Sequence, residues 1–439
     1  MNNMVSQHWE SHISRSGRVR RPSRFAAVIG RLASATALAC LLGVSAADAG
    51  EINYPSFQWT EPTYGAFMKE LKADFEKNNP GIKVKDTFIP YSSFADQMFV
   101  DISSGNAPDV LTAFDPDFKR YIDADLLEPL NPYLDAAGLK LEDFIAPEQL
   151  AVSNGKIYGI PFASNPRALF VNTQMLKSAG LELPKNFEDF QKIVKALRDP
   201  KQQTFGLALS AYSGSASQQF LEYAPIVASF GARFFTDGKP SADTPEMLKA
   251  LTFYKSVVDQ NLVPKGAKFE VFRPMFVNGK IAMYAAGPFM AAVTQAGNLE
   301  TYKNITTVPL MLGNGKPITV TSFLAIPKSS QNKEETAKFL MTLLQEKWQG
   351  RLVELASVIP GRKNMIPAAY LKSNPWFETF NTLASEAVSY APAGVEQYGS
   401  DIIAIIGKRI EAMLFGGVSA QDTTKLIQSD LVAFMATKR

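Results

Sequence analysis

The chain has 439 residues, of which 46% are apolar and 20% are charged, so it is long enough for two domains with separate cores. The first 49 residues contain six arginines, no lysine and only two acidic residues. Without them, the 45 basic and 42 acidic residues fall to 39 and 40, a net charge of −1. This balance excludes an argument from charge for nucleic acid or an anionic membrane surface as a partner, and we expect neither.

The N-terminal segment has the pattern of a secretory signal peptide. Its arginine-rich part is followed by an uncharged, apolar run over 32–46, and Ala47-Asp48-Ala49 has small residues where a signal peptidase cuts. Such a run is too short to span a bilayer. Arg20-Arg21 leaves twin-arginine export open, and Cys40 leaves lipidation open, although Cys40 lies inside the apolar run. We expect residues 1–49 to be removed and the mature protein to be periplasmic.

The mature chain lacks two residue types that most catalytic and metal sites use. Both histidines, His8 and His12, and the only cysteine, Cys40, lie in the N-terminal segment. This excludes Ser-His-Asp and Cys-His catalysis, zinc sites built from thiolates or imidazoles, and disulfides. Only carboxylate, lysine or tyrosine chemistry remains for an enzyme. We therefore expect no catalytic residue, no metal site and no cofactor.

Strands and helices alternate at the start of the mature chain. Strands are predicted over 51–57, 82–89 and 109–114, and apolar residues at helical spacing, such as Phe67, Leu71 and Phe75, predict helices between them. The alternation predicts a parallel, doubly wound sheet, in which ligands bind beyond the carboxyl ends of the strands. Because Trp59, Tyr91 and Asp115 follow the three strands, we expect them to lie close together.

The segment 155–172 predicts a crossing between two domains. Asn154-Gly155 before it favours a type I′ hairpin, because both central residues of that turn need positive φ. The polar, proline-containing step 163–167 then separates two apolar stretches and is too polar for the middle of a buried strand. We predict that the first domain ends near Phe162 and that the second begins at Ala168, with a ligand-binding cleft between them.

The rest of the chain continues the alternation. Helices are predicted over 187–197, 247–258 and 334–345, and strands over 204–209, 281–285 and 318–326. Gly287-Pro288 begins a further helix, whose free backbone N–H groups suit hydroxyl or anionic oxygens. Val308-Pro309 predicts a second crossing. The Gly-Ser loop after Tyr212 lacks the motif of a serine nucleophile or of a phosphate loop, so we interpret it as a polar loop that lines the cleft.

Several motifs follow one another along nearly the whole mature chain: FEKNNPGIKV, GNAPDVLTAF, LLEPLNPYL, GKIYGIPF with RALFVN, MLKSAG, FVNGKIAMYAAGPF, and FLAIPKSS with AKFL. With them the chain resembles the family 1 extracellular solute-binding proteins, the carbohydrate-binding receptors of ABC importers. The resemblance implies an α/β fold with the two lobes of a type II periplasmic binding protein. Each lobe is expected to be a mostly parallel sheet flanked by helices, and hinge strands are expected to join the two.

The resemblance also implies which residues form each lobe and what the lobes do. The first lobe is expected to comprise 50–164 and 309–345, the second 165–308 and 346–439, with hinges near 163–167 and 306–310. The lobes are expected to close on a sugar or sugar-like solute, and the closed form to deliver it to ABC permease subunits in the inner membrane. We expect the receptor to be a monomer.

Sugars are recognised by aromatic faces, which cover the C–H side of the ring, and by polar side chains, which bind the hydroxyls. We expect Trp59, Tyr91, Tyr212 and Phe289 to supply the faces, although each could pack in a core instead. Asp115 could cap a helix, and Arg167 could form a salt bridge between lobes. The expected polar contacts are Asp115, Asn165, Arg167, Ser322, Arg362 and the backbone of Gly287.

Two alternative functions remain open. The first is a receptor for another polar solute, such as a glycerol phosphodiester, a polyol or a polyamine. A preference for phosphate would need a denser basic patch than Arg167 and Arg362. The second is a secreted glycoside hydrolase, which needs only two carboxylates, and Glu61 and Asp115 are the candidate pair.

Overall fold

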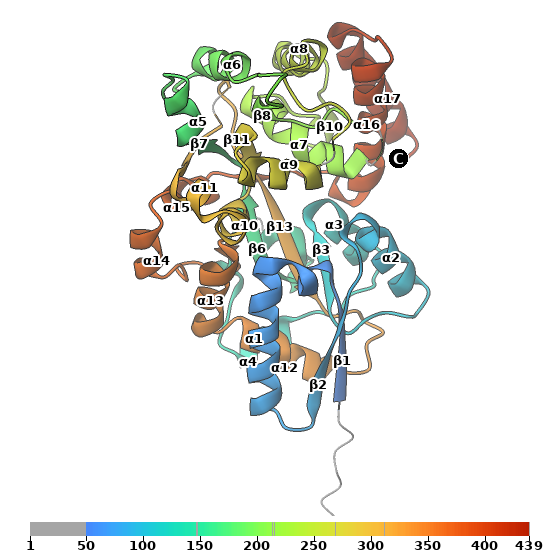
Figure 1. Ribbon diagram of the computed structural model, residues 1–439. Helices are drawn as coiled ribbons and strands as arrows, with labels where there is room; N and C mark the ends of the chain where they lie inside the picture. The colour runs from blue at the N-terminus through green and yellow to red at the C-terminus, as the bar shows by residue number, and fades with distance from the viewer. Residues whose placement is uncertain are drawn as a thin grey trace, which may run out of the picture. The chain divides into compact units, whose positions relative to one another are not determined.

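The computed structural model describes residues 50–145, 148–212, 214, 216–267, 269–310 and 312–438 (Figure 1). The predicted signal peptide lies outside these residues, as do Ser213 and Ser215 of the Gly-Ser loop. In the described part of the chain, no helix combines the length and the apolar character needed to cross a membrane.

A five-stranded sheet, which we name the first sheet, contains the longest strand, β13. The order is β14-β6-β13-β15, and β3 also pairs with β13. β13 runs antiparallel to β6 and β3 and parallel to β15. The strands are β3 (Leu111–Phe114), β6 (Ile160–Pro166), β13 (Ile318–Ala325), β14 (Ile359–Pro360) and β15 (Val388–Ser389).

A four-stranded sheet, the second sheet, has the order β12-β7-β11-β8. β7 is antiparallel to both of its neighbours, and β11 is parallel to β8. The predicted α/β class is confirmed, but the sheets are mixed rather than mostly parallel, because the strands next to the crossings run against their neighbours. The strands are β7 (Ala168–Asn172), β8 (Phe205–Ala208), β11 (Ile281–Ala286) and β12 (Ile305–Val308).

Three further pairs of strands form separate two-stranded sheets in the described part of the chain. β1 and β2 are parallel, whereas β4 with β5 and β9 with β10 form antiparallel hairpins. Asn154 and Gly155, between β4 and β5, have φ of 51° and 74°, as the predicted type I′ turn requires. The bounds are β1 (Gly50–Pro55), β2 (Ile82–Thr87), β4 (Val152–Ser153), β5 (Lys156–Ile157), β9 (Phe235–Thr236) and β10 (Lys239–Pro240).

The helices begin and end close to their sequence signals. In α1, proline lies in the first turn, and Phe67, Leu71 and Phe75 are at most 1% exposed. Before the first crossing the helices are α1 (Pro62–Asn78), α2 (Tyr91–Ser103), α3 (Asp115–Asp123), α4 (Asn131–Ala136) and the 3-10 turns η1 (Phe57–Thr60), η2 (Leu141–Asp143) and η3 (Glu148–Ala151). Between the crossings they are α5 (Thr173–Ser178), α6 (Phe187–Ala196), α7 (Ala216–Ser229), α8 (Pro245–Asp259), α9 (Phe269–Val277), α10 (Phe289–Gly297) and α11 (Leu299–Lys303).

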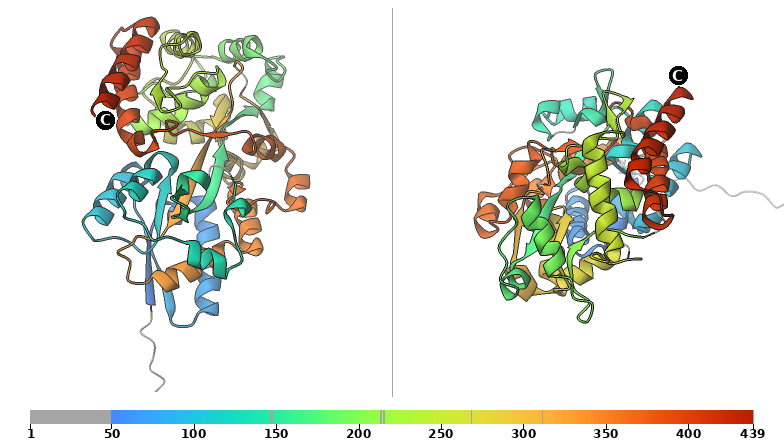
Figure 2. Two further views of the ribbon diagram at one scale, coloured as in Figure 1. Left: turned by 180° about the vertical axis from the view of Figure 1, so that it is seen from behind. Right: turned by 90° about the horizontal axis from the view of Figure 1, so that it is seen from above.

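The helices after the second crossing pack in both halves of the fold. Figure 2 shows the red C-terminal pair, α16 and α17, beside the yellow-green helices, and α16 packs on α7 while α17 packs on α8. These helices are α12 (Lys333–Leu343), α13 (Glu346–Ala356), α14 (Ala368–Ser373), α15 (Phe377–Ala384), η4 (Glu396–Tyr398), α16 (Gly399–Phe415) and α17 (Ala420–Ala436).

The polar step between the domains is part of a strand, which contradicts the prediction that it is too polar for one. β6 continues to Pro166, and Ser164 is only 2% exposed. The hydroxyl of Ser164 is 2.6 Å from that of Thr319 on β13, so the buried polar group is hydrogen-bonded. The chain changes sheet at Arg167, whose N–H donates to the carbonyl of Ile318 (2.9 Å).

Two segments pack away from their expected lobe. α13 was expected with the second lobe, but Trp348 packs edge-on against Phe67 of α1 (ring centroids 6.0 Å), and Arg351 binds Glu70 at 2.8 Å. At the second crossing, the chain leaves the second sheet after Val308, yet it joins the first sheet only at Ile318. In between, Leu312 is buried in the core formed by α7, α8 and α16.

Asp115 is a buried link between segments of the first sheet. It is 0% exposed and follows β3, and its two carboxylate oxygens accept from the N–H of Thr321 on β13 and from the hydroxyl of Ser389 on β15, both at 2.6 Å. Burial raises the pKa of Asp115 from 3.8 to about 7, although both hydrogen bonds act in the opposite direction. Asp115 therefore holds the sheet together rather than facing a ligand.

The raised pKa predicts how stability depends on pH. Between about pH 4 and 7 the folded protein keeps a proton on Asp115 that the unfolded chain has released, so the free energy of unfolding falls as the pH rises, by at most about 1.4 kcal/mol per pH unit. Asp115→Asn can keep both hydrogen bonds and removes this contribution. In urea unfolding at pH 5, 6 and 7.5 we expect a smaller fall in the variant. An identical fall in both proteins would contradict this assignment.

Candidate functional site

A cavity of about 180 Å³ lies around the crossing from the first sheet to the second. Three groups of residues line it. Before the crossing they are Phe57, Gln58, Glu61, Tyr64, Tyr91 and Phe114. On or next to the crossing strands they are Asn165, Arg167, Val320 and Ser322. From the part between the crossings they are Leu221, Glu222, Glu270, Arg273, Tyr284 and Phe289.

The ends of secondary-structure elements place the charged side chains in this cavity. Glu61 immediately precedes α1, and Arg167 occupies the single residue between β6 and β7. Glu270 and Arg273 lie three residues apart on α9, so they share one face of the helix. The cavity therefore brings together groups that are far apart in the sequence.

One ion pair crosses the cavity. Nη1 of Arg273 lies 3.8 Å from Oε1 of Glu61, and the Arg273 guanidinium lies 5.0 Å from the centre of the Phe289 ring. Burial raises the pKa of Glu61, and the charge of Arg273 opposes that shift. The pair joins an element before the crossing to one between the crossings.

Glu222, on α7, is a second acid in the cavity. Burial raises its pKa to about 7, while the nearby charges of Arg167 and Arg273 lower it. The Tyr284 hydroxyl donates to Glu222 at 3.4 Å, and Glu270 accepts from Gln218 at 3.5 Å. Near neutral pH, Glu222 is therefore present in both protonation states and can either accept or donate a hydrogen bond.

Within the described part of the chain, Nε of Arg167 and Oδ1 of Asn165 are buried and lack a hydrogen-bond partner. Among the described residues, no carboxylate lies within 4.0 Å of the Arg167 guanidinium, so Arg167 does not form the salt bridge that was its alternative role. A buried donor and acceptor left open are costly unless something binds them. Their position favours a polar ligand.

The structure brings several of the expected site residues together. Tyr91, Asn165, Arg167, Phe289 and Ser322 all line the cavity. Gly287 lies directly against it, because a Cβ at this position would come within 2.8 Å of Asn165 and 3.0 Å of Phe289. Glycine at this position lets the two side chains meet.

Other expected site residues lie outside this cavity. Trp59 is 3% exposed in the core beside α1, where its indole N–H donates to the carbonyl of Tyr54 at 2.7 Å. Arg362 donates to the carbonyl of Leu344 at 2.9 Å, and the carbonyl of Tyr212 accepts from Gln219 at 2.6 Å. With Asp115 buried in the first sheet, Glu61 and Asp115 do not form the carboxylate pair of a hydrolase.

The sequence did not predict that Glu222, Glu270, Arg273 and Tyr284 line this cavity. One signal was available: Glu222 is the only charged residue in the otherwise apolar stretch of α7 from Phe220 to Val227. Arg273 and Glu270 gave no comparable signal, because a charged pair on a helix is usually exposed.

The arrangement suits the binding of hydroxyl groups. Guanidinium groups donate to hydroxyl oxygens, carboxylates accept from hydroxyls, and aromatic faces cover the apolar side of a ring. Among the described residues, no group of three or more His, Cys, Asp or Glu is placed to hold a metal ion. The cavity also mixes two arginines with three glutamates, which gives it no excess of positive charge.

Known proteins share this fold. The GacH receptor of Streptomyces glaucescens, solved unliganded and with acarbose, superposes with a TM-score of 0.76 at 19% identity, over 87% of this chain and 97% of the other. A solute-binding protein from Agrobacterium vitis S4 with bound D-mannitol gives 0.76 at 21% identity, over 89% and 99%. These likenesses confirm the two-lobe fold of the type II periplasmic binding proteins.

Relatives in sequence are binding proteins too. A binding protein of Brucella abortus (strain 2308) is 27% identical over 365 residues, which are 81% of this chain and 86% of the relative. The galactooligosaccharide-binding protein of Bacillus subtilis (strain 168) is 25% identical over 330 residues, 70% and 72% of the two chains. The model of the bacterial extracellular solute-binding proteins matches residues 59–350, about two thirds of the sequence, and the chain belongs to this family.

Proposed function

We propose that the protein is the receptor of an ABC importer and that it captures a sugar or sugar-like solute in the cavity at the crossing. One observation supports this proposal most strongly. The cavity is lined by aromatic rings and contains a buried donor, Nε of Arg167, and a buried acceptor, Oδ1 of Asn165, that lack hydrogen-bond partners among the described residues. Relatives named for maltotriose and galactooligosaccharide binding support the same solute class.

The charges of the cavity favour a neutral solute with hydroxyl groups, such as a sugar, over a charged one. The fold alone does not decide, because a protein solved with glycerophosphocholine superposes with a TM-score of 0.75. A phosphodiester would meet three glutamates, whereas a polyamine would meet two arginines, so each would face like charges. Neutral hydroxyls can bind both kinds of side chain.

We propose that the two lobes hinge at the crossing strands, near 163–167 and between Val308 and Ile318. The first lobe would comprise 50–164 and 318–345, with α13 added because it packs on α1. The second would comprise 165–317, because Leu312 packs in its core, with the remaining C-terminal residues. Side-chain contacts between the lobes include Glu61 with Arg273, Asp117 with Ser400, and Asp115 with Ser389. A ligand that contacts both lobes would stabilise the closed form.

Export and delivery complete the proposal. Residues 1–49 would direct the protein to the periplasm and be removed, and the closed monomer would dock on the permease subunits. The protein would release its solute chemically unchanged, because the family to which it belongs consists of solute-binding proteins.

Calorimetric titration tests the solute class. We expect at least one sugar or polyol from a broad panel to bind the mature protein with a dissociation constant in the micromolar range or below. Mass spectrometry after overnight incubation is expected to recover that sugar intact. If no compound of the panel binds, or if a hydrolysis product appears, the proposal is contradicted.

Removing the open donor should weaken binding. Arg167→Ala deletes charge-assisted hydrogen bonds worth about 1.5–3 kcal/mol, so we expect a roughly tenfold to hundredfold rise in the dissociation constant. Arg351→Ala, which removes an arginine from the outer face of α13, is the matched control and should bind as the unmodified protein does. Equal affinities of all three proteins would remove Arg167 from the site.

A further inference from the structure

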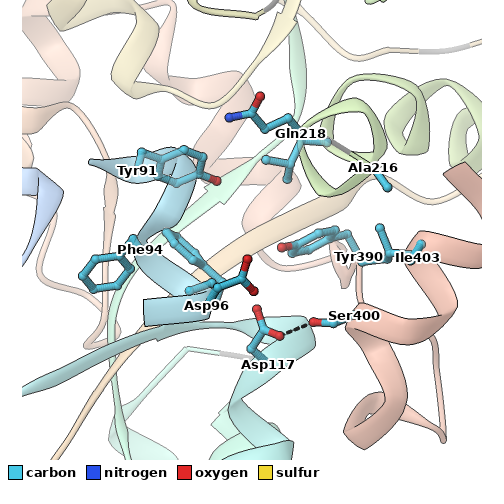
Figure 3. Close-up of a pocket in the computed structure, with 13 residues that line it drawn as sticks. Tyr91, Phe94, Asp96, Asp117, Ala216, Gln218, Tyr390, Ser400 and Ile403 are labelled. Carbon is cyan, nitrogen blue, oxygen red and sulfur yellow. Dashed lines mark hydrogen bonds between the residues drawn. The ribbon is translucent and has the colours of Figure 1, made fainter. Parts of the chain in front are cut away.

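A second cavity, of about 260 Å³, lies next to the candidate site. It is bounded by α2 and α3 before the first crossing, by α7, and by α16 with the segment before it (Figure 3). Like the candidate site, it therefore receives side chains from both proposed lobes.

The two cavities share three lining residues, Tyr91, Phe114 and Leu221. The Tyr91 ring lies 6.0 Å from Phe114 and 4.9 Å from Phe57, in edge-on contacts. The divide between the cavities is therefore largely aromatic. Such rings pack well against the C–H face of a sugar, and here they are available from two sides.

The volumes of the two cavities together are large enough for one ligand. Ligand sites usually measure roughly 300–1,000 Å³. Neither cavity reaches this range alone, at about 180 and 260 Å³, but the two together do.

The second cavity also offers hydroxyl-binding groups. Figure 3 shows the hydroxyl ends of Tyr91 and Tyr390 and the carboxylate of Asp96 directed toward the same space. Asp117 lies below them, held by a hydrogen bond from Ser400 of α16. Carboxylate and phenol oxygens at these positions can bind the hydroxyls of a second ring.

We infer that the natural ligand is an elongated saccharide of at least two units, one in each cavity, both packed against the shared residues Tyr91 and Phe114. This inference rests on the proposed function and specifies its ligand. It makes α2, α3 and α16 part of the recognition surface, although no residue of these elements other than Tyr91 and Asp115 was expected to contact a ligand.

Matched sugar series test the inference. We would titrate glucose, maltose and maltotriose, and galactose, galactobiose and galactotriose, into the mature protein. In the series that binds, we expect the disaccharide or trisaccharide to bind at least tenfold more tightly than the monosaccharide. Ala404→Phe, which enters the second cavity from α16, should remove most of this advantage and leave the affinity for the monosaccharide within twofold.

Two further variants keep the result interpretable. Ala95→Phe enters the same cavity from α2 and should act like Ala404→Phe, whereas Ala433→Phe, at an exposed position of α17, should change neither affinity. If a monosaccharide binds as tightly as its longer relatives and both cavity variants leave binding unchanged, the inference is overturned while the proposed function stands. If no sugar binds, both this inference and the proposed function are overturned.

Discussion

The antiparallel pairing of β6 with β13 is the constraint on which the rest of the structure depends. It holds Thr319 opposite Pro166 and Val320 opposite Asn165, so the backbone of a polar segment is paired within a buried sheet. Arg167 is fixed at the point where the chain changes sheet, by its N–H bond to Ile318. The same pairing thus joins the two halves and places the residues between them.

The balance of charge in the cavity follows from this placement. Among the described residues, Arg167 has no carboxylate partner, while Arg273 is held beside Glu61. Glu222, buried among these charges, has a pKa near 7 and can take either hydrogen-bonding role. Because neither sign of charge is in excess, the cavity suits neutral polar groups, and burying such groups does not require the desolvation of an ionic ligand.

Much of the fold could be predicted from local patterns. The apolar stripe of α1, the Asn154-Gly155 turn and the strand that ends at Phe114 depend on neighbouring residues alone. The strand through Ser164 could not be predicted in this way, because its partner, Thr319, lies 155 residues later. Similarly, Trp59 follows a strand as a ligand-binding residue would, but packing beside α1 buries it.

The site was predictable where residues lie at element ends near the crossing, as Asn165, Arg167 and Phe289 do. It was not predictable where the signal is tertiary. In the sequence, Arg273 resembles any exposed charge on a helix, and only the folded chain places it beside Glu61. Asp115 resembles a ligand contact in the sequence, but in the fold it accepts hydrogen bonds from β13 and β15. Residue type alone could not show that Arg273 lines the cavity and that Asp115 does not, because the difference depends on tertiary contacts.

The central claim is that two lobes close about the β6–β13 crossing on a bound saccharide. Spin labels at Phe88→Cys in the first lobe and Val271→Cys in the second would report on this closure directly. The native side chains at these positions are 53% and 44% exposed, and the mature chain has no other cysteine. Pulsed electron–electron double resonance should show a shorter and narrower distribution of distances between the two labels when the tightest-binding sugar of the titrations is added. A distribution that stays unchanged while calorimetry shows saturation would contradict the account.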